Sequence, residues 1–244
     1  MAEPAAVARP GPLALAFAWT GGVVFVLSLG SCIYLYATAW GIEVTGGLWR
    51  PVLADIGLFT LFALHHSVLA RTGAKRLVTS ILPAWLERSV YTWVASLLFL
   101  LVSVEWRAVP GVLYALSGGW QLPGHTAQIA GLVLTMKATA ALDGLDLAGI
   151  RQILNARRAA PPRHVPLNTA GVFGIVRHPL YFGWVLLVFG APTMTGTRFV
   201  FAVVSTLYLA IAVPFEERSL VEVFGHAYED YQRRTRWRIV PGIW

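Results

Sequence analysis

The most restrictive feature of this chain is the run of residues 13–42, which contains no Asp, Glu, Lys or Arg. A membrane-spanning helix needs about 20 mostly apolar residues, so this run is long enough to cross a bilayer. Charged residues make up only 13% of the whole chain, whereas a typical soluble domain contains about 25%. The chain is therefore predicted to be an integral membrane protein.

Further apolar stretches predict the rest of the fold. Five of them have the composition of membrane helices, at residues 51–70, 89–104, 125–142, 179–193 and 199–215. The sequence thus predicts a single all-α integral membrane domain over residues 1–244, with about six transmembrane helices. The last two are short, are joined by a turn at residues 194–198 and form a helical hairpin. A cytoplasmic amphipathic tail is expected after them, because Phe224, Tyr228 and Tyr231 follow helical spacing.

The basic residues indicate the orientation in the membrane. With the N-terminus inside, 15 of the 19 Lys and Arg residues fall in inner segments and three in outer segments. Basic residues concentrate on the cytoplasmic side of membrane proteins. Both termini and the active site are therefore predicted to face the cytoplasm, with the protein in a bacterial inner membrane. The same distribution explains the net charge of +7 without nucleic acid, for which the chain has no binding motif.

Cysteine and histidine usage argues against a disulfide framework or a metal site. The single cysteine, Cys32, lies inside the first apolar run, so a packing role is expected for it. The histidines lack the spacing that zinc-binding motifs use. We therefore expect no metal.

Ionisable residues gather at one level, the predicted cytoplasmic ends of the spans. Ionisable groups near membrane depth are costly and usually functional. Both signs of charge are present, which suits a zwitterionic ligand better than a simple ion. The residues concerned are His65, His66, Arg71, Glu87, Arg88, Asp143, Asp146, Arg151, Arg177, His178, Tyr181, Glu216, Glu217 and Arg218.

Each of these groups also has a simpler interpretation. Arg177 and His178 could anchor a helix end in lipid headgroups, and the Glu216–Glu217 pair could be a solvated helix end. The adjacent histidines His65 and His66 could be ordinary interfacial residues, or haem ligands. The tail could lie on the membrane as an amphipathic helix.

The order of motifs in the C-terminal part resembles a known superfamily. RHPLYFGW at 177–184 is followed by an apolar hairpin, by EERSLVEVFGHAYEDYQRR at 216–234 and by VPGIW at 240–244. This order resembles the isoprenylcysteine carboxyl methyltransferase and phospholipid methyltransferase superfamily, whose members are membrane enzymes that use S-adenosylmethionine. The core of the resemblance covers residues 168–244, which are therefore expected to form the cofactor-binding part.

Four motifs further upstream narrow the resemblance. They are HHSVLAR at 65–71, LERSVY at 86–91, DLAGIRQ at 146–152 and APTMT at 191–195. Together they are similar to the branch of the superfamily that contains the methanethiol S-methyltransferases.

The resemblance implies which residues bind the cofactor. Arg177 could meet the carboxylate of S-adenosylmethionine as a charge-assisted pair, and Glu216 or Glu217 could meet its ammonium group or ribose hydroxyls. The implied cofactor-binding residues are Arg177, His178, Pro179, Tyr181, Glu216, Glu217 and Tyr228.

The predicted acceptor is a small or lipophilic thiol, with methanethiol, which would yield dimethyl sulfide, as the first candidate. A free thiol with a pKa of about 8.5 is only slightly ionised at neutral pH, and the thiolate is the nucleophile. A cation could stabilise the thiolate, or a base could take the proton. The candidates for the first role are Arg71, Arg151 and His66, and those for the second are His66, Asp146 and Glu217.

Two other functions stay open at this point. The acceptor could be a prenylcysteine carboxylate or a lipid, since the C-terminal motifs are shared with enzymes of that kind. Alternatively, the chain could be a non-enzymatic haem-binding protein of nitrogen-oxide metabolism that uses His65, His66 or His178. Membrane lipid is an expected partner in every case, and the sequence does not indicate an oligomeric state.

Overall fold

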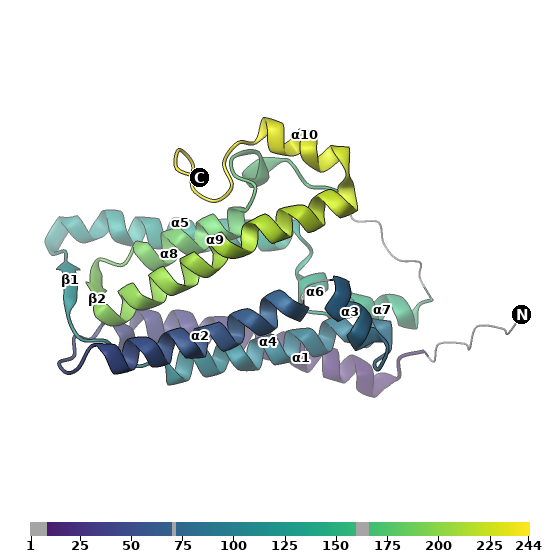
Figure 1. The fold of residues 1–244 in the computed structure, drawn as a ribbon, viewed down its shortest axis with the longest axis horizontal. Helices are drawn as coiled ribbons and strands as arrows, with labels where there is room; N and C mark the ends of the chain where they lie inside the picture. Colours follow the sequence, from purple (N-terminus) through teal and green to yellow (C-terminus); the bar gives the residue numbers. More distant parts are fainter. Residues whose placement is uncertain (1–8, 70–71, 160–165) are drawn as a thin grey trace, which may run out of the picture. The chain divides into compact units, whose positions relative to one another are not determined.

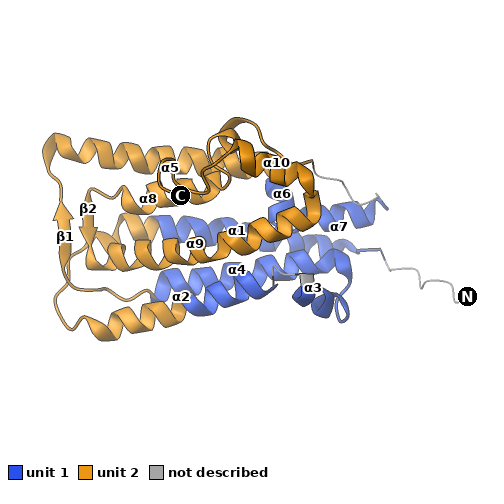
Figure 2. Ribbon diagram, turned by 45° about the horizontal axis from the view of Figure 1, so that its top comes forward, with its two compact units in different colours: residues 1–33, 60–105, 143–164 blue, residues 34–59, 106–142, 165–244 orange. Residues whose placement is uncertain are grey.

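The computed structural model describes residues 9–69, 72–159 and 166–244. Helices account for 74% of the described residues, so this part of the chain is all-α apart from one small ribbon. The chain divides into two compact units (Figure 2). Unit 1 comprises residues 1–33, 60–105 and 143–164, and unit 2 comprises residues 34–59, 106–142 and 165–244.

The elements follow one another along the chain as labelled in Figure 1. The α-helices are α1 (Pro12–Ala37), α2 (Trp49–Leu69), α3 (Thr72–Thr79), α4 (Ala84–Glu105), α5 (Gln121–Ala141), α6 (Gly144–Leu147), α7 (Ile150–Arg157), α8 (Pro179–Phe189), α9 (Gly196–Phe224) and α10 (His226–Arg234). Between them lie the 3-10 helices η1 (Ala39–Gly41), η2 (Gly118–Trp120) and η3 (Gly171–Gly174), and the strands β1 (Val112–Ala115) and β2 (Thr193–Thr195).

Four helices of the described chain are long and apolar enough to cross a membrane. They are α1 with its extension to Gly41, α2, α4 and α9. This agrees with an all-α integral membrane protein and with the predicted apolar stretches 13–42, 51–70, 89–104 and 199–215. Of the other two predicted spans, α5 has 21 residues and α8 has only 11, or about 16 Å of helix.

Unit 1 is held together by close contact between α4 and the segment before α7. Ser89 on α4 donates its hydroxyl to the carbonyl oxygen of Gly149 at 2.6 Å. Gly149 has φ +75, and a Cβ there would lie 2.7 Å from the backbone of Ser89, so only glycine fits. This contact supports an apolar cluster of Ala18, Ala148, Ile150 and Ile153.

In unit 2, α5 and α8 pack against each other through their backbones. A Cβ at Gly131 would lie 2.4 Å from the carbonyl oxygen of Gly183, and a Cβ at Gly183 would lie 2.4 Å from Thr135 Oγ1. Two facing glycines thus let the helix axes approach closely, as small residues do in membrane helix pairs. The segment that leads into the functional site directly precedes α8 in the chain, so this packing helps to position it.

The predicted turn at residues 194–198 is instead the end of a strand and the start of a helix. Strand β2 pairs antiparallel with β1, with Val112 opposite Thr195 and Ala115 opposite Thr193. Thr195 then caps α9 by accepting a hydrogen bond from the backbone N–H of Arg198 at 3.2 Å. The distant segment 112–115 supplied the pairing partner, which no local turn signal could reveal.

Arg198, in the first turn of α9, holds the last residues of α1, which belong to the same unit 2. Its guanidinium donates to the carbonyl oxygens of Tyr36 at 2.9 Å, Ala37 at 3.0 Å and Thr193 at 2.8 Å. A cation is favourable at a helix C-terminus, where several carbonyl groups lack helical partners. The charge is therefore used structurally, although the sequence suggested only an outer-loop arginine.

The other helix boundaries also differ from the prediction. Helix α5 begins at Gln121 rather than at residue 125, because Pro123 in a first turn sacrifices no helical hydrogen bond. Helix α8 ends at Phe189, before Gly190 and Pro192. Helix α9 continues to Phe224, so Glu216 and Glu217 lie inside a helix, and the second helix of the hairpin is long rather than short.

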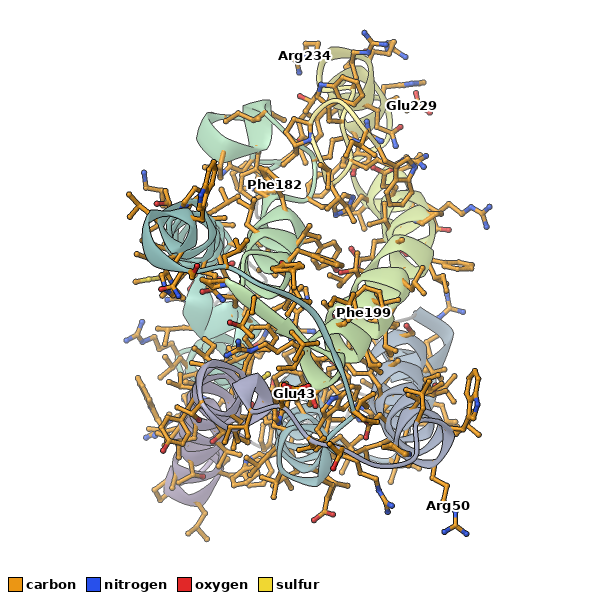
Figure 3. All side chains as sticks on the ribbon, turned by 90° about the vertical axis from the view of Figure 1, so that its left-hand side faces the viewer. Glu43, Arg50, Phe182, Phe199, Glu229 and Arg234 are labelled. Atoms are coloured by element: carbon orange, nitrogen blue, oxygen red, sulfur yellow. The ribbon has the colours of Figure 1, made fainter. Side chains whose placement is uncertain are left out.

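The tail packs on the protein within unit 2. Tyr228 and Tyr231 of α10 are 1% and 2% exposed and join a cluster with Ala138 and Phe173. In Figure 3 the side chains of Glu229 and Arg234, on the same helix, point away from the ribbon. The two buried rings that suggested a membrane-surface helix are therefore occupied by protein contacts.

Candidate active site

The segment before α8 is held in a non-helical path that leads into the site. A residue that precedes proline avoids helical backbone angles, and His178, which precedes Pro179, has φ −120 and ψ 67. The backbone N–H groups of Arg177 and His178 donate to the carbonyl oxygens of Trp237 at 2.9 Å and Arg238 at 2.8 Å. The segment is thus paired with the C-terminal residues, and Pro179 begins α8 as its first residue.

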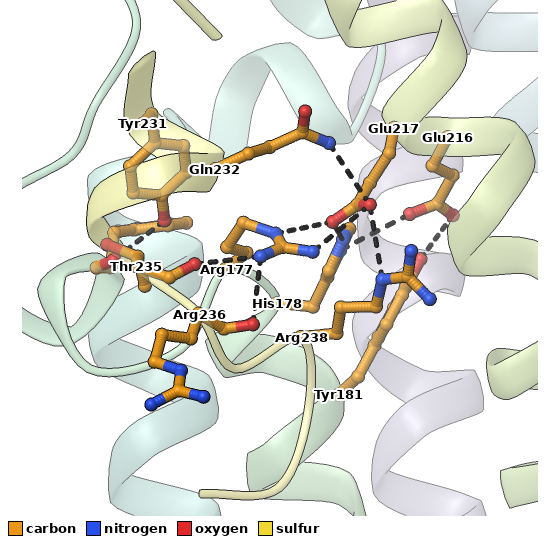
Figure 4. Close-up of polar contacts among 11 residues, drawn as sticks. Arg177, His178, Tyr181, Glu216, Glu217, Tyr231, Gln232, Thr235, Arg236 and Arg238 are labelled. Atoms are coloured by element: carbon orange, nitrogen blue, oxygen red, sulfur yellow. Dashed lines mark hydrogen bonds and ion pairs between the residues drawn. The ribbon is translucent and has the colours of Figure 1, made fainter. Parts of the chain in front are cut away.

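Arg177 and Glu217 form a buried ion pair at the centre of the site (Figure 4). Arg177 donates from Nε to Glu217 Oε1 at 2.6 Å and from Nη2 to Oε2 at 3.2 Å. The two side chains are only 7% and 5% exposed. Nη1 of Arg177 also donates to the carbonyl oxygens of Thr235 at 2.7 Å and Arg236 at 3.0 Å. Most of the N–H donors of Arg177 are therefore used within the protein.

Glu217 is surrounded by donors from three further residues. Gln232 Nε2 donates to its Oε2 at 3.2 Å, and His178 Nε2 lies 3.3 Å from its Oε1. Arg238 Nε lies 3.4 Å from Oε2. With Arg177 these groups fill the acceptor positions of a carboxylate, so Glu217 connects α9 to α8, α10 and the residues after α10.

Glu216 occupies a different environment next to it. Its side chain is 38% exposed. It accepts a hydrogen bond from the hydroxyl of Tyr181, and His178 Nδ1 lies 3.6 Å from its Oε2. The rings of His178 and Tyr181 are stacked, with centroids 5.4 Å apart and planes 5° apart. Together they form a flat aromatic wall beside a half-exposed carboxylate.

Two tyrosines of α10 close the site from the other side. Tyr231 donates its hydroxyl to the carbonyl oxygen of Phe173 at 2.7 Å, and burial raises its pKa to about 12. Burial and the neighbouring Glu217 also raise the pKa of Tyr228. The hydroxyl of Tyr228 is buried and has no hydrogen-bond partner among the described residues. A buried polar atom in this condition is expected to find a partner when a ligand binds.

The remaining predicted residues belong to unit 1. His66 Nδ1 lies 2.8 Å from the hydroxyl of Tyr91, and the guanidinium of Arg88 lies 5.0 Å from the centre of the Tyr91 ring. The neighbouring His65 ring stacks on the same tyrosine at 5.6 Å. The motifs HHSVLAR on α2 and LERSVY on α4, which are separate in the sequence, thus meet in one cluster.

Asp146 and Arg151 lie in a second group of unit 1. Arg151 pairs with Asp143 at 2.7 Å, and Asp146 accepts a hydrogen bond from Gln152 Nε2 at 3.0 Å. The hydrogen bond from Arg151 is the main reason why the pKa of Asp143 lies below its ordinary value. Arg71, the third predicted cation for a thiolate, lies outside the described residues.

Known proteins resemble this chain over most of its length. The phospholipid methyltransferase family matches residues 129–227. Methanethiol S-methyltransferase 2 of Bradyrhizobium diazoefficiens is 36% identical over 190 residues, which is 77% of this chain and 73% of that protein. The chain belongs to the methanethiol S-methyltransferase family. It is therefore a methyltransferase, which needs a methyl donor, and the superfamily prediction is confirmed.

Other relatives define the wider setting of this methyltransferase. A methanethiol S-methyltransferase of Crocosphaera subtropica is 34% identical over 195 residues, which is 77% of this chain and 74% of that protein. A protein-S-isoprenylcysteine O-methyltransferase of Arabidopsis thaliana is 36% identical over 75 residues, which is 30% of this chain and 38% of that protein. No solved structure matches the chain significantly.

Several residues of these clusters received no role from the sequence. Arg238 and Gln232 contact Glu217, but in the sequence they look like ordinary charged and polar residues of the tail. Asp143 was expected among the ionisable residues but not as the partner of Arg151, and Tyr91, in the LERSVY motif, was given no role of its own. Gln232 lies four residues after Tyr228, so helical spacing could have placed it beside this buried tyrosine on the surface of α10. Within residues 9–69, 72–159 and 166–244, no group of three or more His, Cys, Asp or Glu could hold a metal.

Proposed function

We propose that this protein transfers a methyl group from S-adenosylmethionine to a small or lipophilic thiol, with methanethiol as the first candidate. The observation that carries the proposal is the buried Arg177–Glu217 pair, which is flanked by further groups of both charges at the start of α8. The named activity of the relatives in Bradyrhizobium and Crocosphaera supports a thiol acceptor.

The residues of the site fit S-adenosylmethionine as a donor. The ligand carries an ammonium, a carboxylate, a sulfonium and an adenine ring. The site offers a half-exposed carboxylate at Glu216, the stacked rings of His178 and Tyr181, and the hydroxyl of Tyr228, which has no partner among the described residues. We propose that the cofactor site comprises Arg177, His178, Pro179, Tyr181, Glu216, Glu217 and Tyr228, all within residues 168–244 of one methyltransferase domain.

When bound, S-adenosylmethionine supplies a methyl group on a sulfonium, which is electrophilic without help from a metal. The protein then has to align the acceptor and exclude water. The buried pair and its neighbours orient the site, because Glu217 holds four surrounding side chains in fixed positions. Pro179 contributes by forcing His178 out of helical geometry.

The acceptor proton requires a base that takes it or a cation that stabilises the thiolate. His66 is the first candidate base, since its ring nitrogen already exchanges a hydrogen bond with Tyr91. Asp146 is an alternative base, and Arg151 is a candidate cation for the thiolate. Glu217 stays a candidate as well, although its oxygens are engaged by several donors.

We further propose that the protein lies in a bacterial inner membrane with both termini and the active site in the cytoplasm. The supporting observation is the bias of 15 inner against three outer basic residues. Cytoplasmic access is required for a donor that is a soluble, charged metabolite.

Binding and transfer assays test the proposed function. The full chain in detergent is titrated with S-adenosylmethionine in a calorimeter, and labelled methyl transfer is measured to a panel of thiols that includes methanethiol. Arg177→Ala and Glu217→Gln should bind the donor at least about tenfold more weakly, because each variant breaks the buried pair that holds the surrounding residues of the site. Arg157→Ala, an exposed residue of α7, should bind like the parent. A parent chain that neither binds the donor nor methylates any thiol would rule the proposal out.

A lipophilic acceptor is the second candidate. It is favoured by the match to phospholipid methyltransferases and by the Arabidopsis relative, whose name specifies a prenylcysteine. Offering a prenylcysteine, a phospholipid amine and methanethiol in one assay separates the candidates by which product accumulates. The family assignment favours either acceptor over the haem-binding alternative. A haem absorbance band that disappears in His66→Ala would instead support haem binding.

A further inference from the structure

Two charged side chains at the rim of the site are free to meet a ligand, whereas the buried pair is not. Arg177 makes four hydrogen bonds within the protein, and Glu217 accepts bonds from Arg177 and Gln232. Both are at most 7% exposed. Arg238 and Glu216 are 35% and 38% exposed. The charges of the inner pair cancel each other, so the outer two residues present one positive and one negative group to a ligand.

Arg238 still has donors to offer. Among the described residues its guanidinium has two contacts, the ion pair from Nε to Glu217 Oε2 at 3.4 Å and the Trp244 ring at 5.1 Å. No hydrogen bond from its Nη1 or Nη2 to another described residue is present. A planar guanidinium binds a carboxylate through two parallel N–H donors, and Nη1 and Nη2 of Arg238 can supply them.

The C-terminal loop fixes the place of this guanidinium. The carbonyl oxygen of Trp244 accepts hydrogen bonds from the backbone N–H groups of Arg238, Ile239 and Val240 at 2.9, 3.0 and 3.2 Å. Gly242, with φ +82, makes the reversal that this closure needs. The motif VPGIW thus folds back and sets the Trp244 ring against the guanidinium of Arg238. Preorganisation of this kind lowers the cost of binding.

Glu216 is the matching acceptor. Among the described residues its carboxylate receives one hydrogen bond, on Oε1 from Tyr181. Its Oε2 has His178 Nδ1 at 3.6 Å, which is too long for a hydrogen bond. Figure 4 shows the carboxylate of Glu216 and the guanidinium of Arg238 on the same side of the cluster, with Arg236 pointing away from it.

We propose that Arg238 and Glu216 bind the amino-acid end of the methyl donor, Arg238 its carboxylate and Glu216 its ammonium, while the Arg177–Glu217 pair holds both in place. The assignment rests on the proposed function. It revises the expectation that Arg177 itself contacts the carboxylate, because the donors of Arg177 are used within the protein. The site therefore recognises the zwitterion with its half-exposed outer pair of charges.

Ligands that lack one charge test this assignment directly. The full chain in detergent is titrated with S-adenosylmethionine, with its decarboxylated form and with an analogue that lacks the amino group. The parent should bind the complete donor about tenfold or more tightly than either analogue, as expected for a lost hydrogen bond to a charged group. Arg238→Ala should lose the preference over the decarboxylated form but keep the preference over the deaminated analogue. Glu216→Gln should show the reverse pattern.

Two further variants keep the outcome interpretable. Arg238→Lys retains the charge beside Glu217 but loses the paired donors, so it should keep part of the preference, and it serves if the alanine variant unfolds. Arg234→Ala, an exposed arginine of α10, should bind all three ligands like the parent. If Arg238→Ala or Arg238→Lys discriminates against the decarboxylated form as strongly as the parent does, the assignment of Arg238 is wrong. A parent that binds none of the three ligands would overturn the proposed function itself, and this assignment with it.

Discussion

Arg177 and Glu217 place two full charges where the side chains are almost completely enclosed. Removing charges from water is expensive, and their attraction offsets this cost only if hydrogen bonds also satisfy the remaining atoms. The structure meets that condition, because the carbonyl oxygens of Thr235 and Arg236 and the amide of Gln232 complete the two charged groups. Each member of the pair therefore depends on the other.

At this scale the first prediction concerns stability. Arg177→Ala should lower the free energy of unfolding by about 3–5 kcal/mol, because it leaves the carboxylate of Glu217 buried without its main partner. Arg177→Met combined with Glu217→Gln should lose less than the single alanine variant, since no charge is stranded. Thermal unfolding in detergent measures both. Equal losses in the single and double variants would show that the pair is not energetically coupled.

The pair α5 and α8 shows how one element sets the position of the next. Direct backbone contact at Gly131 and Gly183 leaves no room for a side chain between the helices. Because α8 begins directly after Arg177 and His178, a shift of α8 away from α5 would move the first residues of the site. Packing between these two helices is therefore linked to the geometry of the charged cluster.

A methyl group at this contact gives the second prediction. Gly183→Ala should destabilise the protein by about 1–3 kcal/mol, the usual cost of overpacking, because the new Cβ would meet Thr135 Oγ1 at 2.4 Å and the Gly131 carbonyl oxygen at 2.7 Å. Gly57→Ala on α2 is the matched control, since no atom lies within 4 Å of its Cβ position. Unfolding temperatures of the two variants should differ clearly, and similar values would contradict the close contact.

Helix α10 gives a prediction on pH. Burial raises the pKa of Tyr231 from its ordinary value of 10.0 to about 12, and the pKa of Tyr228 rises in the same direction. The folded state therefore binds these protons more tightly than the unfolded chain does. This contribution to stability is complete below pH 10 and is lost as the pH rises toward about 12.

Tyrosinate absorbance during an alkaline titration measures this effect. The two buried tyrosines should ionise only together with unfolding of the tail, above the pH at which exposed tyrosines ionise. Tyr231→Phe should remove part of the alkaline destabilisation, and Tyr34→Phe, an exposed tyrosine of α1, should leave it unchanged. Ionisation of all tyrosines in one step near pH 10 would show that α10 is not docked.

At the scale of the whole molecule, the distribution of basic residues predicts the topology. A fluorescent protein fused after Trp244 should be bright and a phosphatase fused there inactive, because the C-terminus is expected in the cytoplasm. Fusions after Arg107, in a predicted outer segment, should give the reverse. A phosphatase that is active after Trp244 would overturn the predicted orientation.

Much of the fold could be predicted because long apolar runs leave a chain few options. Within a bilayer the backbone must satisfy its own hydrogen bonds, so the runs 13–42, 51–70 and 89–104 were expected to be helical, and helices α1, α2 and α4 cover most of them. The motifs around Arg177, His178 and Glu217 also identified the superfamily, because residue types at fixed spacing are visible without coordinates.

Tertiary structure alone decided which charges satisfy each other and which remain for a ligand. Arg177, Arg198 and Arg238 are indistinguishable as letters, yet one is paired with Glu217, one holds the end of α1 and one keeps free donors at the rim. Likewise, strand β2 exists because residues 112–115 lie beside it. Arg177 and Arg198 find partners in segments 40 and 162 residues away, and the energy of a charge depends on its burial and its partners. Local sequence therefore determined the helices, while long-range packing determined the chemistry.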